Sequence, residues 1–542
     1  MKTADIIYLN GNIYTVNDNF DVAEAFAVKE DRFIAVGSNE EIKKYADADT
    51  EIIDLKGKTV IPGIIESHLH VNFFGIGQME VDGHNLKLDE VLDLVKKEHD
   101  SCGPNDWIRG DGWNENNWGA SKYPTKEDLD KVSPDKPVNL KRACGHMAWL
   151  NSKALELAGI TKDTPDPVGG EILKDENGEP TGIITDAAQE FVWKVWPEYT
   201  DQDYRKAALF AQKAFFKYGI TSVHDAGSGE DVLNRWEDMY RSGELKIRNY
   251  AMYRVPGRPT YEELMDTASD YFERNGIKIG KYNNRFTCRA FKVSGDGSLG
   301  ARSAWMSEEY SDRPGHCGNG KFTDEQFYNV VKLTADHNFQ MVTHCIGDAM
   351  CHQAIDTYEK VLNERPAYDH RFRIEHSQIL KLEDIPRYAK IGIIPSVQPI
   401  TIGADKQIAI SRMGEERIKG AYAWRKLIDS GSKVVPISTD APVDPVNPFL
   451  NMYVAVTRKD INGIPEGGWY KEMAMTREEA LRGATINGAK AGFEEGIKGS
   501  IEAGKLADFA IIDNDIMKCP EDEIKNIEVL KTVLGGENVY ER

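Results

Sequence analysis

Cysteine is scarce in this chain, and its few copies are scattered. Seven cysteines occur among 542 residues, none in a Cys-x-x-Cys pair: Cys102, Cys144, Cys288, Cys317, Cys345, Cys351 and Cys519. An odd number without regular spacing is not the disulfide framework of a small secreted domain. We therefore expect the protein to work in a reducing cytoplasm.

Long apolar runs and an excess of basic residues are missing as well. Asp5 and Asn10 interrupt the first apolar residues, so the apolar core of a signal peptide is lacking. No stretch approaches the ~20 apolar residues of a membrane span. The 88 acidic residues exceed the 67 basic ones by 21, whereas binding to nucleic acid or an anionic membrane needs clustered Lys and Arg. We expect a small-molecule substrate, neither nucleic acid nor membrane as partner, and a homo-oligomer.

Both ends of the chain are rich in short strand patterns. Residues 6–9 and 13–16 flank Asn10-Gly11-Asn12, which predicts a hairpin. Two further apolar runs flank the charged turn at Lys29–Arg32, and two more lie at 507–512 and 529–533. We therefore predict a small β-sandwich domain assembled from residues 1–58 and 491–542.

The middle of the chain alternates short apolar runs with helical patterns. The eight runs are Thr59–Ile65, Thr221–His224, Ile247–Tyr253, Phe286–Val293, Gln340–His344, Phe372–His376, Ile393–Gln398 and Lys433–Thr439. Eight strands alternating with helices favour an α/β protein with a (β/α)8 TIM-like barrel, here residues 59–490. A Trp-rich stretch, 71–203, separates the first run from its helix and is predicted to be an insertion at the barrel's C-terminal face.

A histidine pair follows the first run and points to metal chemistry. His68 and His70 are two residues apart, so on a strand both side chains point to the same side. Alone, the pair could equally be two hydrogen-bonded polar residues. His344, His376 and Asp440, however, end the fifth, sixth and eighth runs, at the face where barrel enzymes place catalysis. Imidazole and carboxylate groups converging there predict a metal site.

Lys292 is the exception, because it lies inside the fourth run. A lysine in a barrel wall loses solvation, which lowers its pKa and makes the neutral amine accessible. The residues alone allow two interpretations: a functional amine, or a packed stem whose amine pairs with Asp296.

This pattern resembles the amidohydrolase superfamily. His-x-His on strand one, Lys on strand four, His on five and six, and Asp on eight match its ligand positions. The segments 62–70, 296–303, 344–348, 438–443 and 499–513 resemble the branch that contains N-substituted formamide deformylases, as do 145–155 and 219–225. The resemblance implies a divalent metal, Zn by preference, as one or two ions held by His68, His70, Lys292, His344, His376 and Asp440. It also implies that carbon dioxide carboxylates Lys292.

Two positions depart from the family pattern. Gln398-Pro399-Ile400-Thr401 has Thr where the branch usually has His, which puts the typical substrate in doubt. Gly347 stands where single-metal deaminases carry a proton-shuttling Glu, which argues against nucleobase deamination.

The leading functional hypothesis is a metal-dependent hydrolase of a non-peptide C–N bond in an amide, formamide or cyclic amide. Asp440, expected to face the histidine pair across the barrel mouth, would act as general base and then as general acid. Two alternatives stay open: an esterase or lactonase on the same site, and a non-catalytic regulatory protein that keeps the fold.

Three further residues are candidates for substrate contact. His146 and His224 can donate to an oxyanion or substrate, or can be structural, as a helix cap and a hydrogen-bonded barrel residue respectively. Trp113, near Trp118, can floor an apolar pocket, although aromatic residues are more often core residues.

Overall fold

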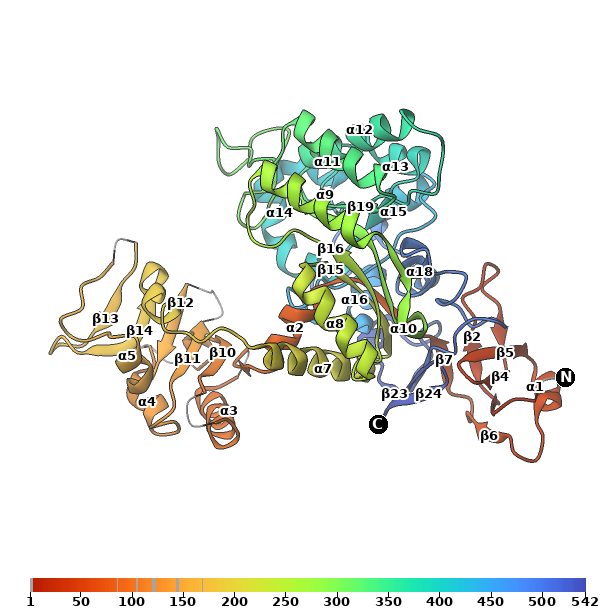
Figure 1. Cartoon of the computed structure of the whole chain (residues 1–542), viewed down its shortest axis with the longest axis horizontal. Coiled ribbons are helices and arrows are strands. Elements are labelled where there is room, and N and C mark those ends of the chain that lie inside the picture. The colour runs from red at the N-terminus through yellow and green to blue at the C-terminus, as the bar shows by residue number, and fades with distance from the viewer. Residues whose placement is uncertain (1–2, 85, 104–105, 119–122, 143–145, 168) are drawn as a thin grey trace. The chain divides into compact units, whose positions relative to one another are not determined.

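The computed structural model describes residues 3–542 except 85, 104–105, 119–122, 143–145 and 168. The described residues fall into two compact units (Figure 1). Unit 1 comprises residues 1–71 and 212–542, and unit 2 comprises residues 72–211. Each unit has its own sheets and core. Within the described residues, every helix is too short or too polar to cross a membrane.

The centre of unit 1 is a sheet of seven parallel strands that follow one another in chain order. They are β8 (Ile64–Leu69), β15 (Ile220–Ser228), β16 (Arg248–Tyr253), β18 (Phe286–Ser294), β19 (Gln340–Cys345), β20 (Arg373–His376) and β21 (Ile394–Ser396). A short strand, β17 (Lys278–Gly280), pairs antiparallel with β18. This nearly closed barrel with helices between its strands confirms the predicted fold class.

The eighth predicted strand does not form, and this expectation was wrong in detail. The run 433–439 makes only one isolated bridge, from Ile437 to Val397. It nevertheless fills the gap in the barrel: the Ser438 amide donates to Val397 O at 3.0 Å, and the Asp440 amide donates to His68 O at 3.0 Å. Pro436 has no amide hydrogen to donate to a ladder, which is one physical reason for the irregularity.

Helices follow the barrel strands (Figure 1). They are α8 (Glu230–Ser242), α9 (Tyr261–Asn275), α11 (Asp324–Asp336), α12 (Asp348–Asn363), α13 (Ile385–Ile391), α14 (Ile402–Arg417), α15 (Trp424–Asp429), α16 (Pro448–Thr457), α17 (Arg477–Gly483) and α18 (Ile486–Ala491), with the short α1 (Asn39–Ile42) and α10 (Lys281–Asn284) elsewhere in the unit. Several begin with capping boxes, such as Thr260 with Glu263 before α9, which satisfy the otherwise unpaired first amides.

The two ends of the chain build a pair of sheets in unit 1. One sheet has the order β5 (Arg32–Gly37), β4 (Ala25–Lys29), β1 (Ile6–Leu9), β6 (Glu51–Asp54). The other has the order β24 (Glu537–Glu541), β23 (Val529–Leu534), β22 (Phe509–Ile512), β7 (Thr59–Pro62), β2 (Asn12–Tyr14), β3 (Val22–Ala23), so three C-terminal and three N-terminal strands share one sheet and meet where β22 pairs with β7 (Figure 1). A shared core joins the two sheets, with the Phe26 and Phe509 rings 5.0 Å apart.

Two local expectations at this end of the chain were wrong. β1 and β2 do not form a hairpin, because they lie in different sheets. The run 59–65 is not one strand but two, β7 in the terminal sheet and β8 in the barrel, with Gly63 between them. A Cβ atom at Gly63 would lie 2.1 Å from Thr221 Oγ1, so only glycine allows the chain to cross at this point.

Unit 2 is built on a mixed sheet. Its order is β13 (Ile172–Lys174), β14 (Pro180–Thr185), β12 (Met147–Leu150), β11 (Val138–Arg142), β10 (Ile108–Trp113), β9 (Val81–Asp82). The accompanying helices are α3 (Leu88–Ser101), α4 (Lys126–Asp130), α5 (Ser152–Leu157) and α6 (Glu190–Trp193). α2 (Val71–Gly77) and α7 (Asp201–Lys217) lie where the chain passes between the units.

Candidate metal centre

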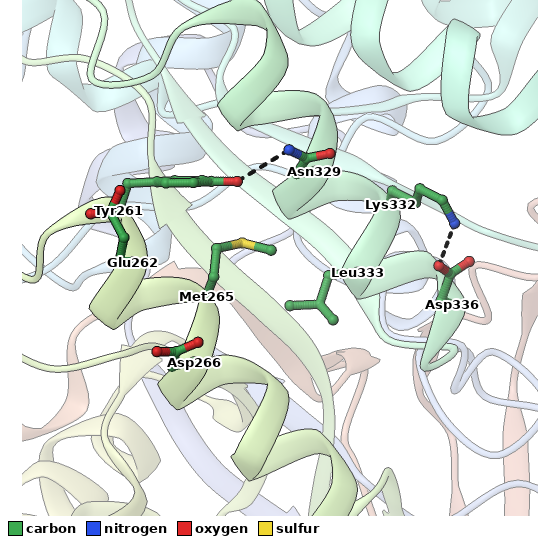
Figure 2. A pocket seen from close by; sticks show the side chains of 8 residues that line it. All are labelled: Tyr261, Glu262, Met265, Asp266, Asn329, Lys332, Leu333 and Asp336. Atoms are coloured by element: carbon green, nitrogen blue, oxygen red, sulfur yellow. Dashed lines mark hydrogen bonds and ion pairs between the residues drawn. The ribbon is translucent and has the colours of Figure 1, made fainter.

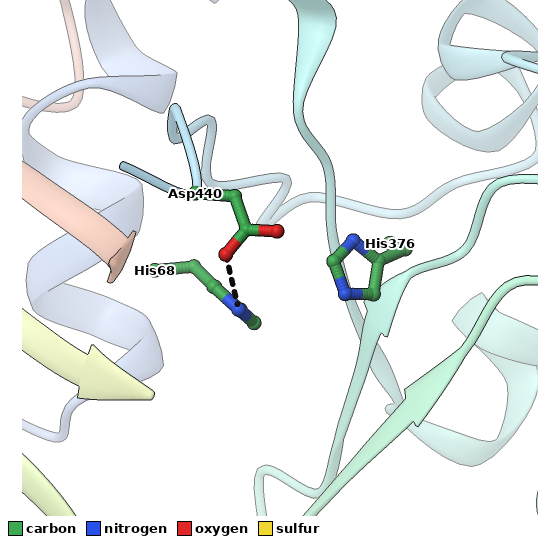
Figure 3. A group of neighbouring side chains, drawn as sticks. All are labelled: His68, His376 and Asp440. Atoms are coloured by element: carbon green, nitrogen blue, oxygen red, sulfur yellow. Dashed lines mark ion pairs between the residues drawn. The ribbon is translucent and has the colours of Figure 1, made fainter. Parts of the chain in front are cut away.

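Three of the predicted ligands gather at the C-terminal ends of the barrel strands. His68 lies on β8, His376 ends β20, and Asp440 follows the irregular eighth run. One ligand atom from each lies within 4.8 Å of the others, and Figure 3 shows the three side chains converging on one point. Two imidazoles and a carboxylate form the donor set of many zinc sites.

Asp440 connects this cluster to His70. Its Oδ1 atom lies 3.3 Å from Nε2 of His68 and 3.3 Å from Nε2 of His70. The structure corrects the expected position of Asp440: it lies beside the histidine pair, not across the barrel mouth from it. Barrel closure makes the eighth segment the neighbour of β8, and the Asp440 amide donates to His68 O.

The protonation states of the cluster suit a cation. Burial alone would raise the pKa of the Asp440 carboxyl, but the histidines around it, His68 foremost, hold it well below the usual range. Burial lowers the pKa of His376 to about 3. At neutral pH the site therefore offers an ionised carboxylate and a neutral imidazole, the forms that bind metals.

His344 and Lys292 lie next to the cluster. The His344 ring is 4.4 Å from the His376 ring between centroids, and its Nε2 donates to Gly297 O at 3.1 Å. Lys292 is 5% exposed, and burial lowers the pKa of its amine to about 8, although the Glu375 and Asp440 carboxylates oppose this shift. Among the described residues, Asp296 makes no ion pair with Lys292; its carboxylate accepts backbone amides, including Gly347 at 2.8 Å.

Sequence reasoning missed a buried pair that supports the cluster. Glu375 accepts a hydrogen bond from Nδ1 of His68, and Arg373 donates from Nε to Glu375 Oε1 at 2.7 Å. Both side chains are fully buried. Burial opposes ionisation of Glu375, but Arg373 and His68 hold its pKa well below its usual value. The available signal was Arg373-Ile374-Glu375-His376, with two opposite charges two residues apart on a buried strand.

His224 lies in the barrel wall, in the middle of β15. Its Nδ1 atom accepts from Arg373 at 3.0 Å, and burial followed by the charge of Arg373 lowers its pKa well below the usual value. A Cβ atom at Gly492 would lie 3.3 Å from His224 Nε2, so this nitrogen points towards the end of α18. These contacts match the structural alternative, a hydrogen bond inside the barrel.

The remaining two substrate candidates belong to unit 2. His146 is exposed and pairs with Asp186, with Nδ1 and Oδ1 2.8 Å apart. Trp113 is fully buried, donates from its indole to Leu140 O at 2.8 Å and stacks on Trp118. This is the environment of a core residue.

The position of the missing deaminase Glu has no room for a side chain. A Cβ atom at Gly347 would lie 2.0 Å from the Trp305 carbonyl oxygen. At the other departure, Thr401 lies near Asp444, with Oγ1 and Oδ2 3.4 Å apart. The loop at Trp305 therefore excludes a glutamate at 347 unless the backbone moves.

Comparisons with known proteins agree with this architecture. A model described as the amidohydrolase family matches residues 51–540. The chain is 32% identical over 543 residues to the putative amidohydrolase YtcJ of Bacillus subtilis, and the alignment covers 99% of both chains. It is 28% identical over 559 residues to N-substituted formamide deformylase of Arthrobacter pascens, covering 99% of this chain and 98% of that protein. A crystal structure of an uncharacterized metal-dependent hydrolase from Pyrococcus furiosus matches with a TM-score of 0.75 and 30% identity, over 95% of this chain and 100% of the other.

Proposed function

We propose that this chain, which belongs to the amidohydrolase family of metal-dependent hydrolases, hydrolyses a non-peptide C–N bond in an amide, formamide or cyclic amide. The observation that carries the proposal is the convergence of His68, His376 and Asp440 at the C-terminal ends of the barrel strands. The similarity to a formamide deformylase along the whole chain favours an acyl–nitrogen bond.

The residues of the cluster fit a divalent metal. Asp440 Oδ1 is buried and has no hydrogen-bond partner among the described residues, although two imidazole nitrogens lie 3.3 Å away. A cation at this point would satisfy that oxygen. We propose His68, His70, His344, His376, Lys292 and Asp440 as the ligands of one or two ions. Nitrogen and carboxylate donors suit Zn best.

Lys292 would serve as a ligand after carboxylation. A protonated amine would repel a cation, whereas a carbamate offers two anionic oxygens. Carbamate formation requires the neutral amine, and the lowered pKa of Lys292, about 8, makes that form available.

Asp440 is the proposed proton carrier. A divalent cation, when bound, would polarise the scissile carbonyl and make a water acidic enough to attack at neutral pH. The ionised Asp440 carboxylate accepts the proton of the attacking water and then gives it to the leaving nitrogen, which departs only when protonated. The closed space at Gly347 excludes the alternative shuttle of the deaminases.

Metal analysis combined with a substrate panel tests this function. Protein purified after zinc supplementation is expected to contain one or two ions per chain and to cleave N-substituted formamides or cyclic amides. The panel pairs each amide with its matched ester and adds nucleobases. Metal-free protein, cleavage of esters alone, or ammonia release from nucleobases alone would each contradict the proposal, and metal-loaded protein that cleaves nothing would favour a regulatory role.

Other expectations continue as proposals. We propose a cytoplasmic location and a homo-oligomer, which cell fractionation and sedimentation velocity test. Contacts of His146, His224 and Trp113 with substrate remain proposals too, and the buried positions of His224 and Trp113 favour their structural alternatives.

A further inference from the structure

A cavity opens beside Lys292 at the C-terminal ends of β16 and β18. Its volume is about 880 Å³. Lys292, Val293 and Ser294 form one wall, and the loops 254–261, 297–303 and 313–322 supply the others. The cavity is large enough for a small organic molecule.

The lining of this cavity is strongly basic. Arg254, Arg258, Arg313 and Lys321 all line it, and none of its described lining residues is acidic. Only Arg302 of the lining arginines has a carboxylate partner in the described structure, Asp312, with Nη2 and Oδ2 2.7 Å apart. This concentration of cations is notable in a chain whose net charge is −21.

The cations are close enough to repel one another. Burial, followed by the charges of Arg254 and Arg258, lowers the pKa of the Lys321 amine. For the described residues, no ion pair or side-chain hydrogen bond is found at Arg254, Arg258 or Lys321. An anion entering this space would relieve the repulsion and accept charge-assisted hydrogen bonds, which are stronger than neutral ones.

Arg254 also lies next to the proposed metal ligand. A Cβ atom placed on Gly227 would meet Arg254 Cδ at 3.1 Å and Lys292 Cγ at 3.3 Å. The side chains of Arg254 and Lys292 are therefore neighbours, both close to Gly227, which has no side chain to separate them. A molecule in the cavity can therefore contact Arg254 and lie beside Lys292 at the same time.

We propose that the substrate is an amide that carries a carboxylate, which Arg254, Arg258 and Lys321 bind while the C–N bond lies beside Lys292. The cleavage of an amide rests on the proposed function, whereas the carboxylate on the substrate is inferred from the cavity alone. Arg313 also lines the cavity and adds to its positive field.

The kinetic test uses pairs of formamides that differ only in a carboxylate or a hydroxymethyl group, over a series of spacer lengths. A hydrogen bond to a charged group contributes about 1.5–3 kcal/mol, so losing one should lower kcat/KM about 10- to 100-fold. We expect Arg254→Gln and Arg258→Gln to cause this loss for the carboxylate member and a clearly smaller loss for the neutral member, and Arg254→Lys to restore part of it. Arg258 is exposed, so its substitution leaves the fold intact.

A matched control removes a cation elsewhere. Lys332 lies in a separate groove of about 450 Å³ between α9 and α11, where it pairs with Asp336 (Figure 2). Lys332→Met changes the net charge of the protein by the same amount and should alter neither substrate's kinetics.

A binding test separates this inference from the proposed reaction. Titration calorimetry with succinate should show binding to the metal-loaded wild type and about 10-fold weaker binding to Arg258→Gln. Equal cleavage of both members of each pair, or inorganic phosphate binding where succinate does not, would overturn the carboxylate assignment. If no amide is cleaved but succinate binding depends on Arg258, the carboxylate site stands and the proposed reaction fails.

Discussion

Replacing Glu375 with Gln should weaken metal binding without removing any metal ligand. Glu375 accepts from Nδ1 of His68 and so leaves Nε2 of that ring facing Asp440, 3.3 Å away. A glutamine keeps the size of the side chain but loses the charge that accepts from Nδ1 and so fixes the tautomer of His68. Loss of such a supporting carboxylate typically costs about 10- to 100-fold in metal affinity.

The same substitution should also destabilise the barrel. Arg373 is fully buried and makes two of its hydrogen bonds to Glu375, at 2.7 and 3.1 Å. Removing one member of a buried ion pair typically costs about 3–5 kcal/mol, because the other charge is left uncompensated. Arg373 keeps its bonds to Ser67 O and His224, and the new amide oxygen can accept one more. We therefore expect about 3 kcal/mol, the lower end of that range.

Two measurements check these values. Urea unfolding of metal-free protein gives the loss of stability, and competition with a chelator gives the metal dissociation constant. Glu495→Gln is the matched control, because Glu495 pairs with Arg371 through two hydrogen bonds but is 33% exposed. The control should lose about 1 kcal/mol or less and bind metal normally. An unchanged metal affinity in Glu375→Gln would refute the supporting role of Glu375.

Three other predictions follow from the site. Asp440→Asn should lower turnover by about 100-fold or more, as expected for losing an acid–base group; near-normal turnover in a variant with full metal content would place the proton carrier elsewhere. Lys292→Ala should lose activity and metal, and a small carboxylic acid should partly restore both; full activity without it would make Lys292 structural. Burial raises the pKa of Glu66 to about 8, so the folded, metal-free protein holds a proton that the unfolded chain releases near pH 4.5. Stability should therefore fall as pH rises from about 4.5 to 8, by about 5 kcal/mol at most, and Glu66→Gln should flatten this part of the urea-midpoint profile; an equally steep profile in the variant would contradict the assignment.

Much of the fold was predictable because the signals are local. Alternation along a strand places His68 and His70 on one side whatever the rest of the chain does. The order of apolar runs and helical segments indicates a barrel, and the ends of those runs bring His344, His376 and Asp440 to one face. The family pattern also rests on short segments, and the match over residues 51–540 confirms it.

The errors arose where a local pattern does not determine the partner. The strands around Asn10-Gly11-Asn12 resemble a hairpin, but β1 pairs with β4 and β6, and β2 with β3 and β7. The run 59–65 reads as one strand, although close approach to Thr221 at Gly63 divides it between two sheets. Asp440 was expected across the barrel from His68, yet closure of the barrel makes the two segments neighbours.

The amino-acid sequence by itself therefore determined which residue types are available for metal chemistry and at which strand ends they stand. Only the tertiary structure decided what surrounds them. The Glu375–His68 hydrogen bond joins residues 307 positions apart, and the basic cavity is assembled from loops after two different strands. Such contacts depend on how the barrel closes and how its loops pack, because charges distant in sequence interact only after the fold has brought them within a few ångströms.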